Sequence, residues 1–195
     1  GNGTQSLTAS NAYTGITTIS AGTLAAVNPY ALGPSNDLTI TAGTLDVRTP
    51  HLYVNSLAGS GGTIANNSTT TTNTLVIQGT TATTFAGSMV DGASGKMALS
   101  LLGGTLRLNA ANTFTGGSTV ASGATLALGN SPASLAGSVV ASNLTTLSLA
   151  GGSSSPGTPA AITTVDGATV LFTSLAAGTP WSGQFYGSAP PTNRV

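Results

Sequence analysis

The chain has 195 residues, no formal net charge at pH 7 and no cysteine. Charged residues make up 4% of it, and none of them is glutamate, whereas an ordinary soluble domain has about 25%. A nucleic-acid-binding surface needs clustered cations, and a coiled coil or an exposed helix needs Glu, Lys and Arg, so these classes are excluded. Disorder is excluded as well, because 39% of residues are hydrophobic and the mean hydropathy is +0.28.

The remaining composition favours a β-rich domain with a neutral, hydroxyl-rich surface. The chain holds 34 threonines, 23 serines and 27 glycines. Without cysteine there is neither a disulfide nor a thiolate metal site. No apolar run approaches the roughly 18 residues of a membrane span; the longest candidate, residues 97–102, has the length of a strand. Because the chain opens on Gly1, we interpret it as a processed form or a fragment of a longer protein.

Two segments that lie 101 residues apart share a pattern of apolar, asparagine, aromatic and glycine positions. Leu7, Asn11, Tyr13, Gly15 and Gly22 in the first segment correspond to Leu108, Asn112, Phe114, Gly116 and Gly123 in the second. Such self-similarity at a fixed offset indicates a repeat architecture. We expect Tyr13 and Phe114 to occupy equivalent places as core or corner side chains rather than as sugar-stacking rings.

A shorter rhythm of Gly-Thr-Leu followed by alternating residues predicts short strands. It occurs at residues 43–47, 104–108 and 123–128, and in looser form at 73–77 and 145–149. Apolar residues alternate with polar ones at the period of a strand. The preceding glycine permits a corner with positive φ.

Because these steps recur about every 20 residues, a solenoid explains them better than a sandwich or a barrel. At about 20–25 residues per coil, residues 1–195 would form about eight or nine coils, about 40 Å long at a strand spacing of about 4.8 Å. Threonine ladders would lie outside and Leu, Val and Ile ladders inside. We therefore predict an all-β, parallel β-solenoid.

The sequence divides into residues 1–150, with two copies of the unit of about 101 residues, and an atypical segment 151–195. The second segment contains a Gly/Ser/Pro stretch, one expected strand over residues 164–171 and a Pro-containing tail. It also gathers three aromatic residues, Trp181, Phe185 and Tyr186. These three either cap the last coil or contact the next molecule, because a solenoid end exposes an unpaired strand edge.

The repeated segments resemble the autotransporter-associated β-strand repeat over roughly residues 4–150. The resemblance rests on residues 11–15 and 112–116, each of which leads into a Gly-Thr-Leu step, and on residues 55–63 and 85–96. It implies a right-handed parallel β-helix of the bacterial exterior, secreted or displayed on the cell surface. It further implies a stalk or scaffold, with adhesion in the wider proteins, and it transfers no catalytic residue, cofactor or metal site onto this chain.

The candidate catalytic residues do not form a recognisable constellation. The four acids are Asp37, Asp46, Asp91 and Asp166. Asp91 and Asp166 each precede a glycine, which indicates a turn capped by Asp with Gly at positive φ, and Asp46 is expected to point outward from a strand. The single histidine, His51, follows Thr-Pro and is expected to be solvated. The run 66–73 is read as a loop or a threonine ladder rather than a glycan acceptor or an adhesive face.

Three functional hypotheses follow. The favoured one is a non-enzymatic structural module of the bacterial exterior that serves as a stalk and self-associates into a fibre through its ends, because a neutral surface lacks charge repulsion. The alternative is an adhesin or carbohydrate-binding module that uses hydroxyl ladders and aromatic rings. A polysaccharide-active enzyme is the third, and it requires clustered carboxylates. We expect no cofactor, no nucleic-acid partner and no membrane-spanning segment.

Overall fold

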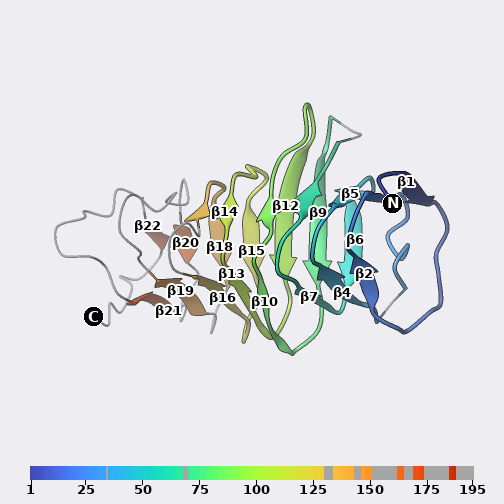
Figure 1. Cartoon of the computed structure of the whole chain (residues 1–195). Helices are drawn as coiled ribbons and strands as arrows, with labels where there is room; N and C mark the ends of the chain where they lie inside the picture. Colours follow the sequence, from blue (N-terminus) through green and yellow to red (C-terminus); the bar gives the residue numbers. More distant parts are fainter. Residues whose placement is uncertain are drawn as a thin grey trace.

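The chain is a parallel β-solenoid, shown by a computed structural model (Figure 1). The structure describes residues 1–33, 35–67, 70–129, 134–142, 146–150, 162–164, 169–173 and 185–187. Strands follow one another around a long axis, with β1 at one end and β21 and β22 at the other. Within the described ranges there is no helix, and each strand pair is parallel. The predicted fold class is therefore confirmed.

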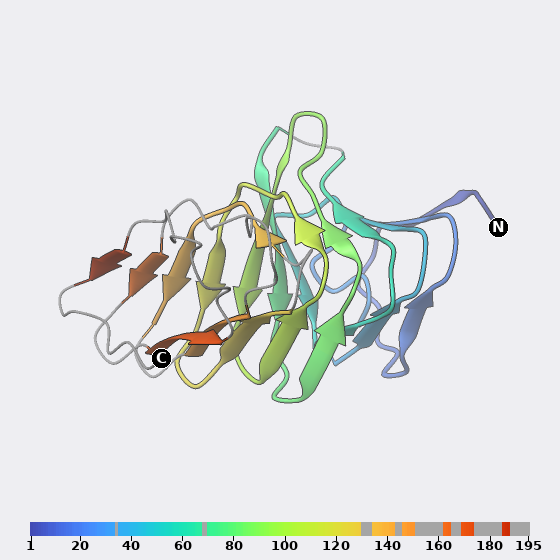
Figure 2. The ribbon, with the colours of Figure 1, turned by 60° about the vertical axis from the view of Figure 1, so that its left-hand side comes forward.

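The described strands form five sheets, which line up along the solenoid as three faces that we call faces 1, 2 and 3 (Figure 2). The sheet β14-β17 continues face 1 beyond β11, and the sheet β2-β4-β7 continues into β10 on face 3. Face 1 contains β1 (Thr4–Leu7), β3 (Thr23–Ala26), β5 (Thr44–Val47), β8 (Thr63–Ala65), β11 (Ser88–Met89), β14 (Ala111–Asn112) and β17 (Ser134–Leu135). Face 2 contains β6 (His51–Val54), β9 (Thr72–Ile77), β12 (Lys96–Leu101), β15 (Ser118–Val120), β18 (Val139–Ala141), β20 (Ile162–Thr164) and β22 (Phe185–Gly187). Face 3 contains β2 (Thr17–Ile19), β4 (Asp37–Ile40), β7 (Ser56–Ala58), β10 (Ala82–Phe85), β13 (Thr105–Leu108), β16 (Thr125–Leu128), β19 (Thr146–Ala150) and β21 (Thr169–Thr173).

The predicted Gly-Thr-Leu strands all form, and their register aligns like with like. On face 1 the threonines that open four strands pair in a column of Thr4, Thr23, Thr44 and Thr63. The next column places Leu24, Leu45, Ile64 and Met89 on one another. Leu45, Ile64 and Met89 are fully buried, and each buried side chain of this size contributes about 1.5–3 kcal/mol. Stacking identical residue types thus produces both the hydroxyl surface and the core.

The number of coils is lower than expected. Coils with a strand on all three faces run from β5 to β19, and the regular stack amounts to about six coils instead of eight or nine. The coil length itself was predicted correctly, because Thr4 pairs with Thr23 and Thr23 with Thr44, steps of 19 and 21 residues. The predicted number of coils assumes that all 195 residues form regular coils, whereas the described part of residues 151–195 contributes only short strands.

The two repeat copies lie on different faces. In the first copy β1 and β3 belong to face 1, whereas the corresponding strands of the second copy, β13 and β16, belong to face 3. The repeat period is thus not a whole number of coils. Equivalent side chains consequently meet different neighbours in the two copies.

The aromatic pair illustrates this difference. Phe114 is fully buried in the core, but Tyr13 is 41% exposed and its hydroxyl lies 3.1 Å from Thr17 Oγ1. Tyr13 belongs to the first coil, in which β1 pairs only with β3 among the described strands. The expectation that both rings occupy equivalent core or corner positions is therefore wrong for Tyr13.

The described strands of residues 151–195 continue the solenoid. The strand expected over residues 164–171 is instead two strands, β20 on face 2 and β21 on face 3. Phe185 and Tyr186 lie in β22, where they pair with Ile162 and Thr163 of β20. Trp181 and Asp166 lie outside the described residues.

Replacing Phe114 by Ala should destabilise the chain by about 3–5 kcal/mol, because it removes a fully buried ring and leaves a cavity. The matched change at the equivalent repeat position, Tyr13→Ala, should cost less than about 1 kcal/mol, because that ring is largely solvated. Denaturant unfolding followed by circular dichroism measures both. Equal losses in the two variants would show that the repeat copies have equivalent environments after all.

Candidate functional site

The glycines of the repeat serve two different purposes. Gly22 and Gly123 adopt positive φ, +69° and +80°, at the corners before β3 and β16. Gly116 is required for close approach, because a Cβ there would collide with the carbonyl oxygen of Met97 in the preceding coil. Gly15 has open space around it.

The asparagines of the repeat join neighbouring coils. The Asn11 Nδ2 donates to the Ala31 carbonyl at 2.7 Å, 20 residues further along the chain. Asn112 is 1% exposed, and its Oδ1 accepts a bond from the Met89 backbone N–H at 2.9 Å, in the coil before it. Leu7 is partly buried against the core and Leu108 is fully buried. Apart from Tyr13 and Gly15, the predicted repeat residues are thus core, corner and inter-coil contacts.

Three further asparagines do the same, and the sequence did not identify them. Asn36 donates to the Gly15 carbonyl, Asn73 to the Val47 carbonyl at 2.8 Å, and Asn66 to the Lys96 carbonyl at 3.2 Å. All three are at most 1% exposed. Asn66 and Asn73 are the first and last residues of the run 66–73, and both are therefore buried contacts rather than glycan acceptors. Their position in the sequence beside the apolar residues of β8 and β9 is the pattern that could have indicated their burial.

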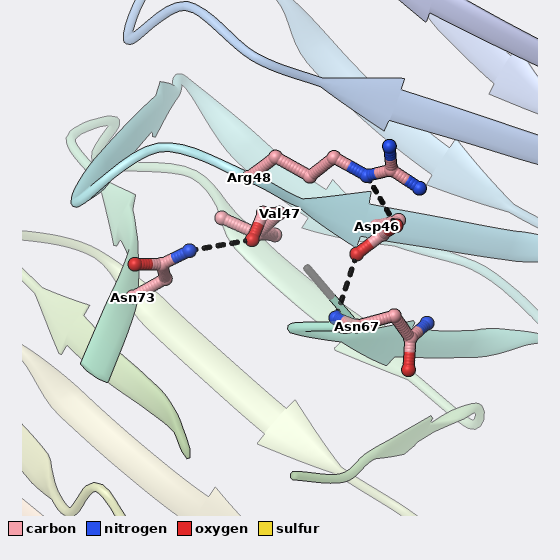
Figure 3. Close-up of polar contacts among 5 residues, drawn as sticks. All are labelled: Asp46, Val47, Arg48, Asn67 and Asn73. Carbon is pink, nitrogen blue, oxygen red and sulfur yellow. Dashed lines mark hydrogen bonds and ion pairs between the residues drawn. The ribbon is translucent and has the colours of Figure 1, made fainter. Parts of the chain in front are cut away.

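The most buried charge of the described residues is Asp46, on β5 (Figure 3). Its neighbours Leu45 and Val47 belong to the core, as the alternation predicts. Asp46 was expected to point into solvent but is 1% exposed. Its Oδ2 pairs with Arg48 Nε at 2.6 Å, and its Oδ1 accepts the Asn67 backbone N–H at 2.8 Å (Figure 3). The segment that follows β8 covers the carboxylate, which is why the expectation failed.

Asp37 lies on β4 and also bonds the neighbouring coil. Its Oδ1 accepts hydrogen bonds from Ser56 Oγ at 2.6 Å and from Asn55 Nδ2 at 2.7 Å. The bond from the Ser56 hydroxyl, followed by that from Asn55, lowers the pKa of Asp37 below its usual value. The carboxylate is therefore held ionised as a structural acceptor, the opposite of the raised pKa that a catalytic acid needs.

Asp91 caps a turn, as predicted, and also reaches the next coil. Its Oδ1 accepts the Met97 backbone N–H at 2.8 Å, and its Oδ2 accepts the Thr115 hydroxyl at 2.7 Å. The expectation of positive φ at Gly92 is wrong, because Gly92 is absent from the positive-φ glycines of the described residues. A Cβ at Gly92 would instead collide with the Asn66 carbonyl oxygen. The glycine is thus required for the spacing between coils.

The described carboxylates lie on different coils, and each is occupied by protein donors. Among the described residues no group of three or more His, Cys, Asp or Glu side chains is placed to hold a metal ion. His51 is exposed on β6 and contacts the Tyr53 ring, with 6.3 Å between the ring centroids. No helix within the described ranges is long and apolar enough to cross a membrane. The arrangement can stabilise a rod, and it offers no paired acid and base.

Comparison with known proteins agrees with this geometry. Residues 1–26 and 103–128 match the Passenger-associated-transport-repeat family. They contain the two copies seen in the sequence, so the chain carries repeats of the autotransporter passenger kind and the resemblance is confirmed. Over 90 residues the chain is 37% identical to the adhesin BmaC autotransporter of Brucella suis biovar 1 (strain 1330). That alignment covers 46% of this chain and 2% of the relative. No solved structure matches the chain significantly.

Replacing Asp46 by Ala should lower the free energy of unfolding by about 2 kcal/mol. The variant removes the acceptor of a part-buried, charge-assisted hydrogen bond from the Asn67 N–H, while the half-exposed Arg48 can return to water. The control is Arg107→Ala, which removes only a 3.2 Å contact with Asn109 and should change stability by less than about 0.5 kcal/mol. Thermal and urea unfolding measure both variants, and similar values for the two would remove Asp46 from the inter-coil network.

Proposed function

We propose that this chain is a non-enzymatic segment of a secreted or cell-surface bacterial protein, and that it acts as a rigid spacer. The observation that carries the proposal is the uninterrupted parallel ladder along face 2, from β6 to β22. Each strand inside such a ladder has both edges paired, so bending the rod requires breaking hydrogen bonds between coils. The passenger repeats and the adhesin relative support the surface location.

Side chains reinforce the spacer both within the strands and at the corners between them. Asn11, Asn73, Asp46 and Asp91 each bond a neighbouring coil. These contacts use neutral amides or carboxylates with short, direct partners. Because only 4% of the residues are charged, salt should have little effect on this rod, and pH should matter mainly where acid protonates the structural carboxylates. The carboxylates of Asp46 and Asp91 already accept hydrogen bonds from protein donors, which supports a non-enzymatic role.

The proposal includes, as a more specific part, that the chain self-associates through the ends of the solenoid. At the first coil, β1 is mostly exposed and pairs on one side only, with β3. A hollow of about 390 Å³ lies there, lined in part by Gly1, Gln5 and Leu24. Where β1 forms the end of the rod, a second copy that stacked on this edge would extend the sheet, which is the common way exposed strands associate.

The spacer role is tested by the distance between two coils in solution. One outward column of face 3 contains Thr18, Thr39, Ala58, Thr84, Arg107, Ala127 and Ser148. Six strand spacings separate Thr18 from Ser148, about 29 Å at about 4.8 Å each. Because the chain has no cysteine, Thr18→Cys with Ser148→Cys accepts exactly two spin labels. We expect a narrow distance distribution near that separation.

A broad distribution, or one far from six spacings, would contradict a rigid rod. A chain labelled only at Ser148→Cys is the control, since any dipolar signal from it must arise between molecules. Such a signal would support end-to-end association, and a purely monomeric decay at high protein concentration would exclude it. Neither outcome alters the test of rigidity, because spin-diluted samples report only the distance within one chain.

Adhesion is the second candidate function, and the 37% identity to an autotransporter named as an adhesin favours it. The purified, fluorescently labelled chain should bind saturably to at least one of a panel of cultured cell types, as measured by flow cytometry. An unlabelled excess of the same chain is the competitor. Binding that fails to saturate, or that the competitor does not reduce, would exclude adhesion by this segment while leaving the spacer role intact.

A further inference from the structure

Exposed apolar side chains gather in the first coils of the solenoid. Of the large hydrophobic side chains that are exposed within the described residues, four precede residue 31: Tyr13 (41%), Ile16 (67%), Val27 (40%) and Tyr30 (43%). Three of the four tyrosines of the chain, Tyr13, Tyr30 and Tyr53, lie in the same part. On a surface built mainly of threonine and serine, this is the region that differs most in chemistry.

Two of these tyrosines form an ordered stack on face 2. The rings of Tyr30 and Tyr53 lie 5.2 Å apart between centroids and are 16° from parallel. The backbone supports the stack, because the Tyr53 N–H donates to the Pro29 carbonyl at 3.0 Å and the Tyr30 N–H to Asn28 Oδ1 at 2.9 Å. His51 adds a third ring beside Tyr53. We call Tyr30, Tyr53 and His51 the ring platform.

One side of the stack is open. On the far side Tyr53 pairs with Val76 of the next coil, which is only 5% exposed. On the near side the first coil passes below Tyr30, where the Asn11 N–H donates to the Tyr30 carbonyl at 3.1 Å. The residues of that passage, Thr8, Ala9 and Ser10, are small and exposed. Beside this passage Tyr30 is 43% exposed.

The platform carries no fixed charge. The formal charges nearest to it in sequence, Arg48 and Asp46, are paired with each other at 2.6 Å. The polar groups placed beside the rings are neutral as well: the amide of Asn28, which accepts the Tyr30 N–H, and the imidazole of His51. An uncharged surface complements an uncharged ligand, because a charged one would lose hydration without gaining an ion pair.

From this arrangement we infer that the ring platform is a binding site for a neutral glycan, with one hexopyranose ring stacked on the open face of Tyr30. Tyrosine offers a large, rigid, amphipathic surface at little conformational cost. The adjacent amide of Asn28 and the imidazole of His51 can orient the sugar hydroxyls, as the few polar groups of a ligand site do. A protein partner would require about 800 Å² per side with an apolar centre, which a single exposed ring does not provide. The site goes beyond the spacer role and names a ligand class for the adhesive one.

Titration of the 195-residue chain with cellohexaose, maltoheptaose and chitohexaose, followed by saturation-transfer NMR and calorimetry, tests the site. A heparin hexasaccharide serves as the acidic comparison. We expect at least one neutral oligosaccharide to bind, and Tyr30→Ala to weaken that binding about tenfold, equivalent to about 1.4 kcal/mol. Tyr13→Ala is the matched control, equally exposed but outside the stack, and should change the affinity less than twofold.

Three results would overturn the inference. They are the absence of binding by all three neutral oligosaccharides, preference for the acidic one, and equal affinities of the Tyr30→Ala and Tyr13→Ala chains. Tyr30→Phe keeps the ring and should retain binding, so a loss as large as that of Tyr30→Ala would exclude stacking. Circular dichroism of each variant verifies folding. The distance between labels at positions 18 and 148 reports the spacer role separately, so failure of one proposal is distinguishable from failure of the other.

Discussion

The hydrogen bond between one coil and the next sets the conditions for everything else in this solenoid. It fixes the spacing at about 4.8 Å, so each side chain must fit the one directly above and below it. Threonine stacks on threonine outside, and Leu24, Leu45, Ile64 and Met89 stack inside. At the corners the same spacing leaves no room for a Cβ at Gly92 or Gly116. The repetitive composition is thus a consequence of the backbone ladder rather than an independent feature.

A chain with so few charges must join its coils by other means. Buried amides do this at Asn36, Asn66 and Asn73, where the side chain reaches a carbonyl of another segment. The carboxylates of Asp37, Asp46 and Asp91 are used in the same way, as acceptors for backbone and side-chain donors. Hydrogen bonds to charged groups contribute about 1.5–3 kcal/mol each, more than neutral ones. The three acids of the described residues therefore act as structural acceptors between coils.

The sequence predicted the strands and the stacking because both depend on local patterns. The Gly-Thr-Leu steps located β5, β13 and β16, and the offset of 101 residues located both repeat copies. The sequence did not predict the burial of side chains that depends on which coil lies beside them. Asp46 is covered by the segment after β8, and Tyr13 is exposed whereas Phe114 is buried. The ring platform could not be predicted from the sequence either. Tyr30 and Tyr53 are 23 residues apart, and their rings stack only because the length of one coil places them side by side.

The displacement of the repeat from face 1 to face 3 has a consequence for longer arrays of this kind. A motif that recurs after a number of coils that is not a whole number points in a different direction around the solenoid axis each time it appears. Successive copies would then be distributed around the circumference instead of lining up on one side. A longer solenoid of this kind would present the motif to its surroundings in several directions, without having to rotate about its own axis.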